Sequence, residues 1–154
     1  MSIKDLFARN NLVIQKTSYT CGPATILNIL HLKGDFSYNE EELAKLCKTD
    51  PKTGTSNKNL VAAAQKVKLK LVEEKQGATT KDIERNIDAG AFVVVCYIHA
   101  YSGEGHYAIV SEYDDRAFYF RDCSFGLFRL KKKYFRKFWH GTDGIQQWYV
   151  ALSS

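Results

Sequence analysis

The segment QKTSYTCGPATILNILHLKG, residues 15–34, is the stretch that decides the fold of this chain. It places a cysteine between a polar loop and an apolar run whose spacing indicates a helix buried on most sides. Gly22 and Pro23 follow the cysteine, and a proline in the first turn removes a backbone N–H that would lack a helical partner. Gly34 supplies the stop that commonly follows a helix. Cys21 is therefore predicted to lie at the N-terminus of a buried helix.

A cysteine at that position has chemical consequences. Unpaired backbone N–H groups and the positive end of the helix dipole favour a thiolate over a thiol, and the thiolate is the nucleophilic form of cysteine. Gly22, which has no Cβ, is expected to let a substrate carbonyl approach the sulfur and the backbone N–H groups. Cys21 is thus a candidate nucleophile.

Length and composition predict one globular domain over residues 1–154. The chain is 45% apolar and 25% charged with only two prolines, which is typical of a folded protein with one core. The longest apolar run, AGAFVVVCYI at residues 89–98, is too short for a membrane span and indicates a buried strand. The first 16 residues carry charges among their apolar side chains, so no signal peptide is expected. These features predict a cytoplasmic protein.

The elements are expected to change from helices to strands along the chain. A capping box at Ser37 and Glu40 predicts the start of a second helix. A third helix has the apolar stripe Leu60, Ala63, Ala64 and Val67. Alternation at residues 68–73 predicts a half-buried strand, and a short helix capped by Thr79 or Thr80 follows and ends at Gly90.

Strands are expected to fill the remainder of the chain. They are predicted at residues 91–98, 106–113, 116–122, near 126–130 and around 147–152. Asp114 and Asp115 mark a tight turn, so the second and third of these runs are expected to form an antiparallel hairpin. Helices followed by strands predict the α+β class.

The four cysteines are widely spaced and form no CxxC pair. This argues against a zinc cluster, and no metal or cofactor is expected. Without a secretion signal they are read as free thiols in a reducing compartment. Cys47 and Cys96 lie in apolar patterns and are expected to be core residues, as is common for free cysteine. The cysteines are Cys21, Cys47, Cys96 and Cys123.

A thiolate nucleophile needs a base or an ion-pair partner, and four histidines are available. His31 lies ten residues beyond Cys21, roughly 15 Å along the helix axis, and is out of reach. His99 and His140 are each compatible with a satisfied surface or core histidine. His106 follows a glycine-rich loop and begins a predicted strand, which favours an imidazole at a strand end facing a cleft.

Two further side chains complete the candidate site. In a hairpin closed at residues 114–115, the position opposite His106 falls at about residue 122 or 123, which selects Asp122 as the group that orients the imidazole. Aspartate at a strand end is otherwise usually a turn former. Gln15, six residues before Cys21, is either a polar surface residue or a second oxyanion donor beside the Cys21 backbone N–H.

The net charge of +5 and the cluster KKKYFRKFWH, residues 131–140, raise the alternative of nucleic-acid binding. Helical spacing favours another interpretation, in which the aromatic side chains face the core and the lysines face water. The side chains expected in the core are Leu130, Tyr134, Phe135 and Phe138, and those expected in water are Lys132, Lys133 and Lys137. No nucleic-acid partner is therefore expected.

These residues resemble those of papain-like cysteine peptidases, specifically the bacteriocin-processing peptidases that cleave double-glycine leaders in ABC exporters. The matching positions are Gln15, residues 21–24, the Gly-His-aliphatic segment 105–110, Asp122, and the segment from Gly54 to Ala64. The resemblance implies a papain-like fold, with the nucleophile on a helical half and the histidine and acid on an antiparallel sheet. It also implies that His106 is the ion-pair partner of Cys21 and that Gln15 binds the oxyanion.

One position departs from the family pattern, because Cys123 follows the acid where proline is common. The sequence leaves three possibilities open for the activity. They are a peptidase or related thiol hydrolase, an acyl or peptidyl transferase that uses the same triad, and a peptide-binding module of the same fold without turnover. A peptide or protein is the expected partner, and the cleaved bond and the oligomeric state stay open.

Overall fold

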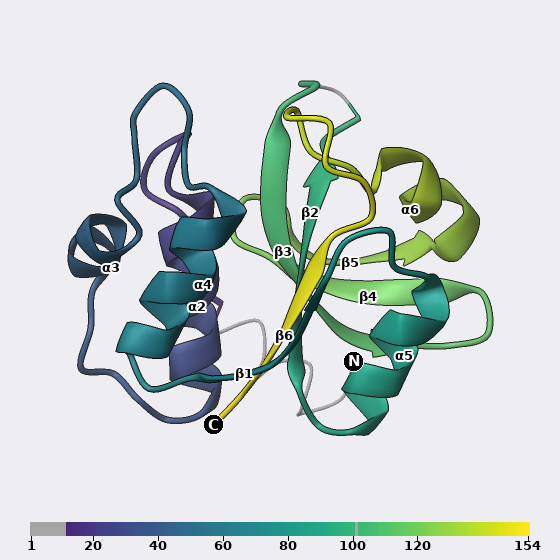
Figure 1. Cartoon of the computed structure of the whole chain (residues 1–154), viewed down its shortest axis with the longest axis horizontal. Coiled ribbons are helices and arrows are strands. Elements are labelled where there is room, and N and C mark those ends of the chain that lie inside the picture. The colour runs from purple at the N-terminus through teal and green to yellow at the C-terminus, as the bar shows by residue number, and fades with distance from the viewer. Residues whose placement is uncertain (1–11, 101) are drawn as a thin grey trace.

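The computed structural model describes residues 12–100 and 102–154, and within them three helices pack on one side of a six-stranded sheet (Figure 1). The three helices are α2 (Cys21–Leu32), α3 (Glu40–Leu46) and α4 (Asn57–Lys66). Two further helices, α5 (Thr80–Asp88) and α6 (Lys132–Phe138), lie on the other side of the sheet. The predicted α+β class is confirmed. The predicted absence of a signal peptide rests largely on residues 1–11, which lie outside the described residues.

Helix α2 begins at Cys21, as its sequence predicts. Its first ten residues are buried, and the Ala24 N–H donates to the Thr20 carbonyl oxygen at 3.0 Å. Gly34 has a φ of +84°, in the left-handed region that favours glycine after a helix end. The helix is thus enclosed between the sheet and its neighbouring helices.

The N-cap of helix α3 lies two residues later than proposed, at Asn39 rather than Ser37. The Asn39 side chain accepts from the Glu42 N–H at 2.8 Å, and the Glu42 carboxylate accepts from the Asn39 N–H at 3.3 Å. Ser37 instead donates to the Asp35 carboxylate. The prediction of Ser37 and Glu40 as the box was wrong, because Asn39 is the better-placed cap.

Glu40 has a tertiary role instead. Its side chain is 4% exposed, and one carboxylate oxygen accepts from the Lys16 N–H and the Thr20 hydroxyl, each at 2.9 Å. A charge-assisted hydrogen bond of this kind is stronger than a neutral one. Glu40 therefore fixes the loop that leads into Cys21.

The sheet is antiparallel throughout and has the order β1-β6-β2-β3-β4-β5. The strands are β1 (Lys70–Lys75), β2 (Phe92–Ile98), β3 (Gly105–Tyr113), β4 (Ala117–Asp122), β5 (Gly126–Lys131) and β6 (Tyr149–Ser153). The predicted hairpin is formed by β3 and β4. The last strand, β6, enters between β1 and β2 (Figure 1).

Strand β1 differs from its prediction. It begins at Lys70 rather than Lys68, and most of it is exposed at the sheet edge, including Leu71 and Val72. A register irregularity between Leu71 and Glu73 interrupts the alternation that the sequence pattern assumed.

Apolar side chains form a core on each face of the sheet. Helices α2 and α4 pack Ile29 and Leu60 against Ile109 and Val150. The other core contains Ile83 of α5 together with the side chains Val95, Phe118, Phe120, Phe135 and Trp139. The sheet is consequently buried over its central strands, which gives the strand ends near the helices fixed positions.

The burial of side chains in the basic cluster, residues 131–140, is only partly as predicted. Phe135 is fully buried, whereas Tyr134 is 42% exposed and lies beside the ammonium groups of Lys133 and Lys137. Lys132, expected in water, is half-buried and bonds Glu84 at 2.9 Å. The helix is only seven residues long, so its aromatic spacing does not hold every ring in the core. Among the described residues, no helix is long and apolar enough to cross a membrane.

Candidate active site

Cys21 lies at the first position of α2, where the helix meets the sheet. Cys21 is 8% exposed, and its carbonyl oxygen accepts a hydrogen bond from the Thr25 hydroxyl at 2.6 Å. The backbone N–H groups of the first turn have no helical acceptor, which provides positive potential beside the sulfur. The sequence prediction of this helix position is confirmed.

Gly22 serves a different purpose from the one the sequence suggested. A Cβ at this position would lie 2.8 Å from the Thr55 hydroxyl oxygen and 2.9 Å from the Thr55 Cβ. The space beside Gly22 is thus filled by Thr55 rather than left for a substrate carbonyl. Glycine is required here for close packing between α2 and the loop before α4.

His106 and Asp122 form a buried pair on the sheet. The His106 Nε2 lies 2.8 Å from the Asp122 Oδ1, and the two residues are 8% and 0% exposed. A hydrogen bond from Nε2–H to the carboxylate leaves Nδ1 as the ring atom for a thiol partner. The carboxylate thereby fixes both the tautomer and the orientation of the ring.

The register of the hairpin explains how these two side chains meet. Ile109 pairs with Arg121, so Asp122 falls opposite Ala108 and not directly opposite His106 as predicted. The difference arises at the turn, because Tyr113 pairs with Phe118 rather than with residue 116, and a register shift between Val110 and Glu112 then brings Asp122 one residue back toward His106. His106 and Ala108 share one face of β3, so Asp122 reaches the imidazole as a diagonal neighbour.

Tyr97 is a site residue that the sequence interpretation missed. It stands directly opposite His106 in the β2–β3 ladder, and its hydroxyl donates to the Asp122 Oδ2 at 2.5 Å. Its ring packs edge-on against the imidazole, with 5.7 Å between the centroids. A polar hydroxyl inside the apolar run of β2 was the available signal, but its significance depends on the strand pairing.

His106 and Asp122 each shift the pKa of the other toward the charged form. Burial alone would raise the pKa of Asp122, but hydrogen bonds from His106, Tyr97 and the Ser124 N–H hold that pKa below its ordinary value. Burial likewise disfavours the imidazolium, yet hydrogen bonding with Asp122, Cys123 and Cys21 raises the pKa of His106 well above its ordinary value. Both shifts favour the charged forms, an imidazolium beside a carboxylate, and hydrogen bonding with the Cys21 thiol contributes to the raised pKa of His106.

Gln15 is held at the same junction. Its backbone N–H donates to the Cys123 carbonyl oxygen at 2.8 Å, and its side-chain oxygen accepts from the Cys123 thiol at 3.1 Å and the Ser124 hydroxyl at 2.6 Å. The amide nitrogen donates one hydrogen to the Thr17 carbonyl oxygen at 2.6 Å. A primary amide has two N–H groups, so a second donor is left.

Cys123 is the second thiol of this junction. It is 1% exposed, and its sulfur lies 3.6 Å from the Cys21 carbonyl oxygen. Donor atoms of His106, Asp122 and Cys123 lie within 4.8 Å of one another, and such groups are zinc ligands elsewhere. Two of them are hydrogen-bonded to each other and the third to Gln15, an arrangement that suits proton transfer without an ion. The predicted absence of a metal stays a prediction.

The remaining histidines differ in their distance from this site. His31 packs against Phe36 at the far end of α2, and His140 pairs with Gln146 in an isolated bridge. His99, which the sequence did not select, stacks on Phe125 with 4.0 Å between centroids and 9° between planes. The Phe125 ring also meets His106 edge-on at 5.7 Å.

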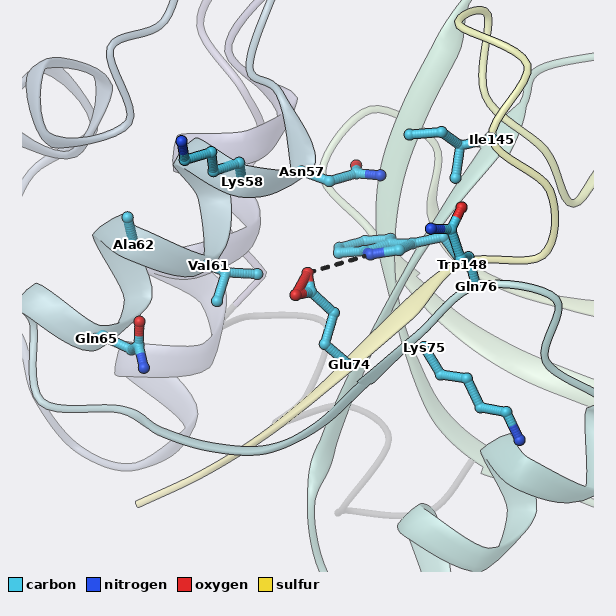
Figure 2. Close-up of a pocket in the computed structure, with 10 residues that line it drawn as sticks. All are labelled: Asn57, Lys58, Val61, Ala62, Gln65, Glu74, Lys75, Gln76, Ile145 and Trp148. Carbon is cyan, nitrogen blue, oxygen red and sulfur yellow. Dashed lines mark hydrogen bonds between the residues drawn. The ribbon is translucent and has the colours of Figure 1, made fainter.

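A groove of about 530 Å³ opens between α4 and the end of β1. Figure 2 shows Asn57 and Val61 facing Trp148, whose indole N–H donates to the Glu74 carboxylate at 3.3 Å. None of the candidate site residues lines this groove. Tyr107, the residue after His106, connects the groove to the candidate site. The Tyr107 hydroxyl donates to the side-chain oxygen of Asn57, which lines the groove, at 2.6 Å.

A cysteine at a helix N-terminus, facing a histidine and an acid on an antiparallel sheet, is the arrangement of papain-like cysteine peptidases. More specifically, the chain belongs to the Peptidase C39 family, whose model matches residues 9–143. This finding confirms the resemblance to bacteriocin-processing peptidases.

Relatives and solved structures are similar to this chain in sequence or in fold. An uncharacterized protein of Methanothermobacter marburgensis is 27% identical over 140 residues, covering 91% of this chain and 90% of its own length. The peptidase domain of Streptococcus ComA, a bi-functional ABC transporter of a quorum sensing pathway, shares the fold with a TM-score of 0.73 at 24% identity and covers 92% of this chain and 96% of its own. A putative C39-like peptidase from Bacillus anthracis has a TM-score of 0.68 at 14% identity, over 95% and 96% of the two chains.

Proposed function

We propose that this protein is a cysteine peptidase whose triad is Cys21, His106 and Asp122. The observation that carries the proposal is the imidazole held by Asp122 at 2.8 Å while it contacts the thiol at the N-terminus of α2. Nucleophile, proton carrier and orienting acid are the three parts that acyl transfer by a thiol requires. The family membership of residues 9–143 supports the same reaction, and we propose that residues 1–154 act as one domain.

The reaction follows from the positions of these groups. The Cys21 thiolate attacks the peptide carbonyl, and the resulting oxyanion accepts hydrogen bonds from the Cys21 N–H and the second amide N–H of Gln15. The His106 imidazolium gives its Nδ1 proton to the leaving amine, which departs and leaves a thioester. Water then loses a proton to His106 as it attacks the thioester, and this step restores Cys21.

The substrate class is proposed from chemistry and from a structural neighbour. A double glycine motif protease from an AMS/PCAT transporter, solved in complex with the leader peptide, has a TM-score of 0.70 at 13% identity, over 92% of this chain and 88% of its own. A peptide with a Gly-Gly site is accordingly the first substrate to test. The free thiols of all four cysteines are consistent with a reducing compartment such as the cytoplasm.

Cleavage of a peptide that carries one Gly-Gly site in its middle tests the proposal. Mass spectrometry of the products is expected to show a cut after the second glycine with the native protein and none with Cys21→Ala or His106→Ala. Asp122→Asn is expected to lower the rate by about 10²-fold or more, because the imidazole loses its fixed tautomer. Cys47→Ala, which alters a buried thiol at the end of α3, is the matched control.

The same experiment separates the alternatives. With an amine added, products that carry the amine and no hydrolysis product would identify a transferase. Binding of the peptide without any product, unchanged in Cys21→Ala, would identify a binding module and overturn the proposal. Iodoacetamide provides a check without substrate, since Cys21 is expected to react first while burial raises the pKa of Cys47 and Cys96 to about 12.

A further inference from the structure

An exposed aromatic ring stands beside the candidate catalytic imidazole. Phe125 is 51% exposed, although its ring stacks on His99 and meets the edge of His106 at 5.7 Å. An isolated exposed phenylalanine is common on protein surfaces. Here the ring is ordered by two neighbours and still presents apolar surface to water at the place where the reaction occurs.

The backbone fixes Phe125 relative to the acid. The N–H groups of Ser124 and Phe125 donate to the Asp122 Oδ1 at 2.8 and 3.0 Å, so this turn is tied to the same oxygen that receives His106. His99 is held from the other side, since its N–H donates to the Glu104 carbonyl oxygen at 2.9 Å. The stacked pair is therefore built into the strand ends that carry the site.

The direction of the proposed reaction decides which part of a substrate meets this pair. His106 must lie within hydrogen-bond reach of the leaving amine in order to protonate it. The proposed oxyanion donors, the Cys21 N–H and the Gln15 amide, come from the start of α2 and the loop before it, whereas the imidazole comes from β3. The residue that follows the scissile bond is attached to the leaving amine, so its side chain comes next to His106 and Phe125.

We propose that Phe125 and His99 form a subsite for the first residue after the scissile bond, and that the subsite selects an apolar side chain there. The inference rests on the proposed peptidase function and adds a substrate class to it. An aromatic or branched aliphatic side chain placed on the Phe125 ring removes apolar surface of both groups from water. Glycine or a charged side chain at that position gains no such burial.

Capture of the acyl-enzyme by amines tests the subsite. N-acetyl-Gly-Gly p-nitrophenyl ester forms the thioester, and equimolar phenylalaninamide and glycinamide then compete with water for it. Mass spectrometry gives the ratio of the two amide products, after subtraction of the background with Cys21→Ala. The ratio is internal to one acyl-enzyme, so it does not depend on how fast that acyl-enzyme forms.

The native protein is expected to favour phenylalaninamide by about tenfold, the discrimination that a simple apolar pocket provides. Phe125→Ala is expected to reduce that preference to about twofold or less, and Phe125→Tyr to retain it. Phe36→Ala is the matched control, because Phe36 is 68% exposed but lies beside His31, away from the site. It is expected to leave the preference as it is.

Three results would overturn the subsite while the peptidase proposal stands. They are a product ratio that Phe125→Ala does not change, a stronger preference for argininamide than for phenylalaninamide, and hydrolysis without any amide product at saturating amine. Release of p-nitrophenol no faster than with Cys21→Ala would instead overturn the proposed function, and the subsite with it.

Discussion

The Asp122 carboxylate is fully buried, and the groups around it explain how it remains ionised there. Oδ1 accepts from His106 and from two backbone N–H groups, and Oδ2 accepts from Tyr97. A buried charge without such partners would be strongly destabilising. The side chain that orients the candidate catalytic base is thus itself held by four donors.

Tyr97 supplies the one donor to Oδ2 among the described contacts, so its hydroxyl is a positioning group. Tyr97→Phe leaves that oxygen buried without the hydrogen bond, and we expect a loss of about 1–3 kcal/mol in the free energy of unfolding. Cleavage is expected to slow by about tenfold, as the carboxylate gains freedom to rotate away from His106. Urea denaturation and steady-state cleavage measure the two effects.

Tyr113→Phe is the matched control for Tyr97. Its hydroxyl also donates to a carboxylate, Asp88, but at the surface, where water replaces the lost partner. We expect its unfolding free energy to change by less than about 0.5 kcal/mol. Equal losses in the two variants would contradict a special role of Tyr97.

The lowered pKa of Asp122 predicts a pH dependence of stability. A carboxyl group whose pKa is lower in the folded state than in the unfolded state, where it is about 3.9, stabilises the protein above that value. The contribution disappears as the pH falls through the lower folded-state pKa. The stability difference between the native protein and Asp122→Asn should therefore be full at neutral pH and shrink below about pH 4. Denaturation in urea at several pH values measures it, and a difference that grows as the pH falls below about 4 would contradict the sign.

The sequence could indicate the candidate site residues because each has a local signal. Cys21 precedes a glycine and a proline at a helix start, and His106 begins an apolar strand after a glycine-rich loop. The local signal of Tyr97, a hydroxyl inside an apolar run, does not indicate a role in the site, since that role arises only from the pairing of β2 with β3. The exact placement of Asp122 also escaped prediction, because the sequence marks neither the longer turn, after which Tyr113 pairs with Phe118, nor the register shift that follows it.

At the scale of elements, the contact between α2 and the loop before α4 determines where Cys21 lies. Gly22 faces Thr55, whose hydroxyl bonds that of Thr49 at 2.8 Å. Thr55 is 8% exposed and short, so it cannot swing away as a long surface side chain would. The start of α2 is therefore set by backbone packing as well as by its own capping.

Gly22→Ala tests this packing. The added methyl group would meet Thr55 at 2.8 Å, so the helix start must shift, and we expect a destabilisation of about 1–3 kcal/mol. Iodoacetamide should also react more slowly with Cys21 once the sulfur is displaced from His106. Gly105→Ala is a matched control for stability, because its new Cβ would meet only Thr142 at 3.8 Å. A Gly22→Ala protein as stable as the native one would show that this contact is loose.

Elements were predictable where propensity and burial agree, and less so where tertiary contacts decide. The hairpin of β3 and β4 has both a turn signal and alternating strands, and it forms as expected. Helix α3 had two possible caps within three residues, and the choice of Asn39 followed from Ser37 binding Asp35 instead. The edge position of β1 depends on where β6 inserts, which no local pattern encodes.

At the scale of the whole molecule, the candidate site is a junction between the helical side and the sheet. Gln15 bonds the turn after β4, Thr25 of α2 reaches the Tyr107 carbonyl oxygen at 3.5 Å, and the Cys123 thiol meets the Cys21 carbonyl oxygen. The nucleophile comes from one side and the imidazole from the other. Any change in how the two sides pack should consequently change the reactivity of Cys21.

Tyr107 is the side chain best placed to test that dependence. It is 4% exposed, comes from β3 beside His106, and donates its hydroxyl to the Thr55 carbonyl oxygen at 2.8 Å and to Asn57 at 2.6 Å. Tyr107→Phe keeps the ring but leaves the buried Thr55 oxygen without this donor. We expect a loss of about 1–3 kcal/mol in the free energy of unfolding, together with slower alkylation of Cys21.

Tyr134→Phe is the control for Tyr107, since that hydroxyl belongs to a ring that is 42% exposed on α6, on the other side of the sheet. Tyr134→Phe should leave the free energy of unfolding and the alkylation rate of Cys21 unchanged. The core that joins α2 and α4 to the sheet includes residues of both sides, so Tyr107→Phe should still unfold in one cooperative transition. Two separate transitions would show that the halves are stable independently, and an unchanged alkylation rate would show that the position of His106 does not depend on this junction.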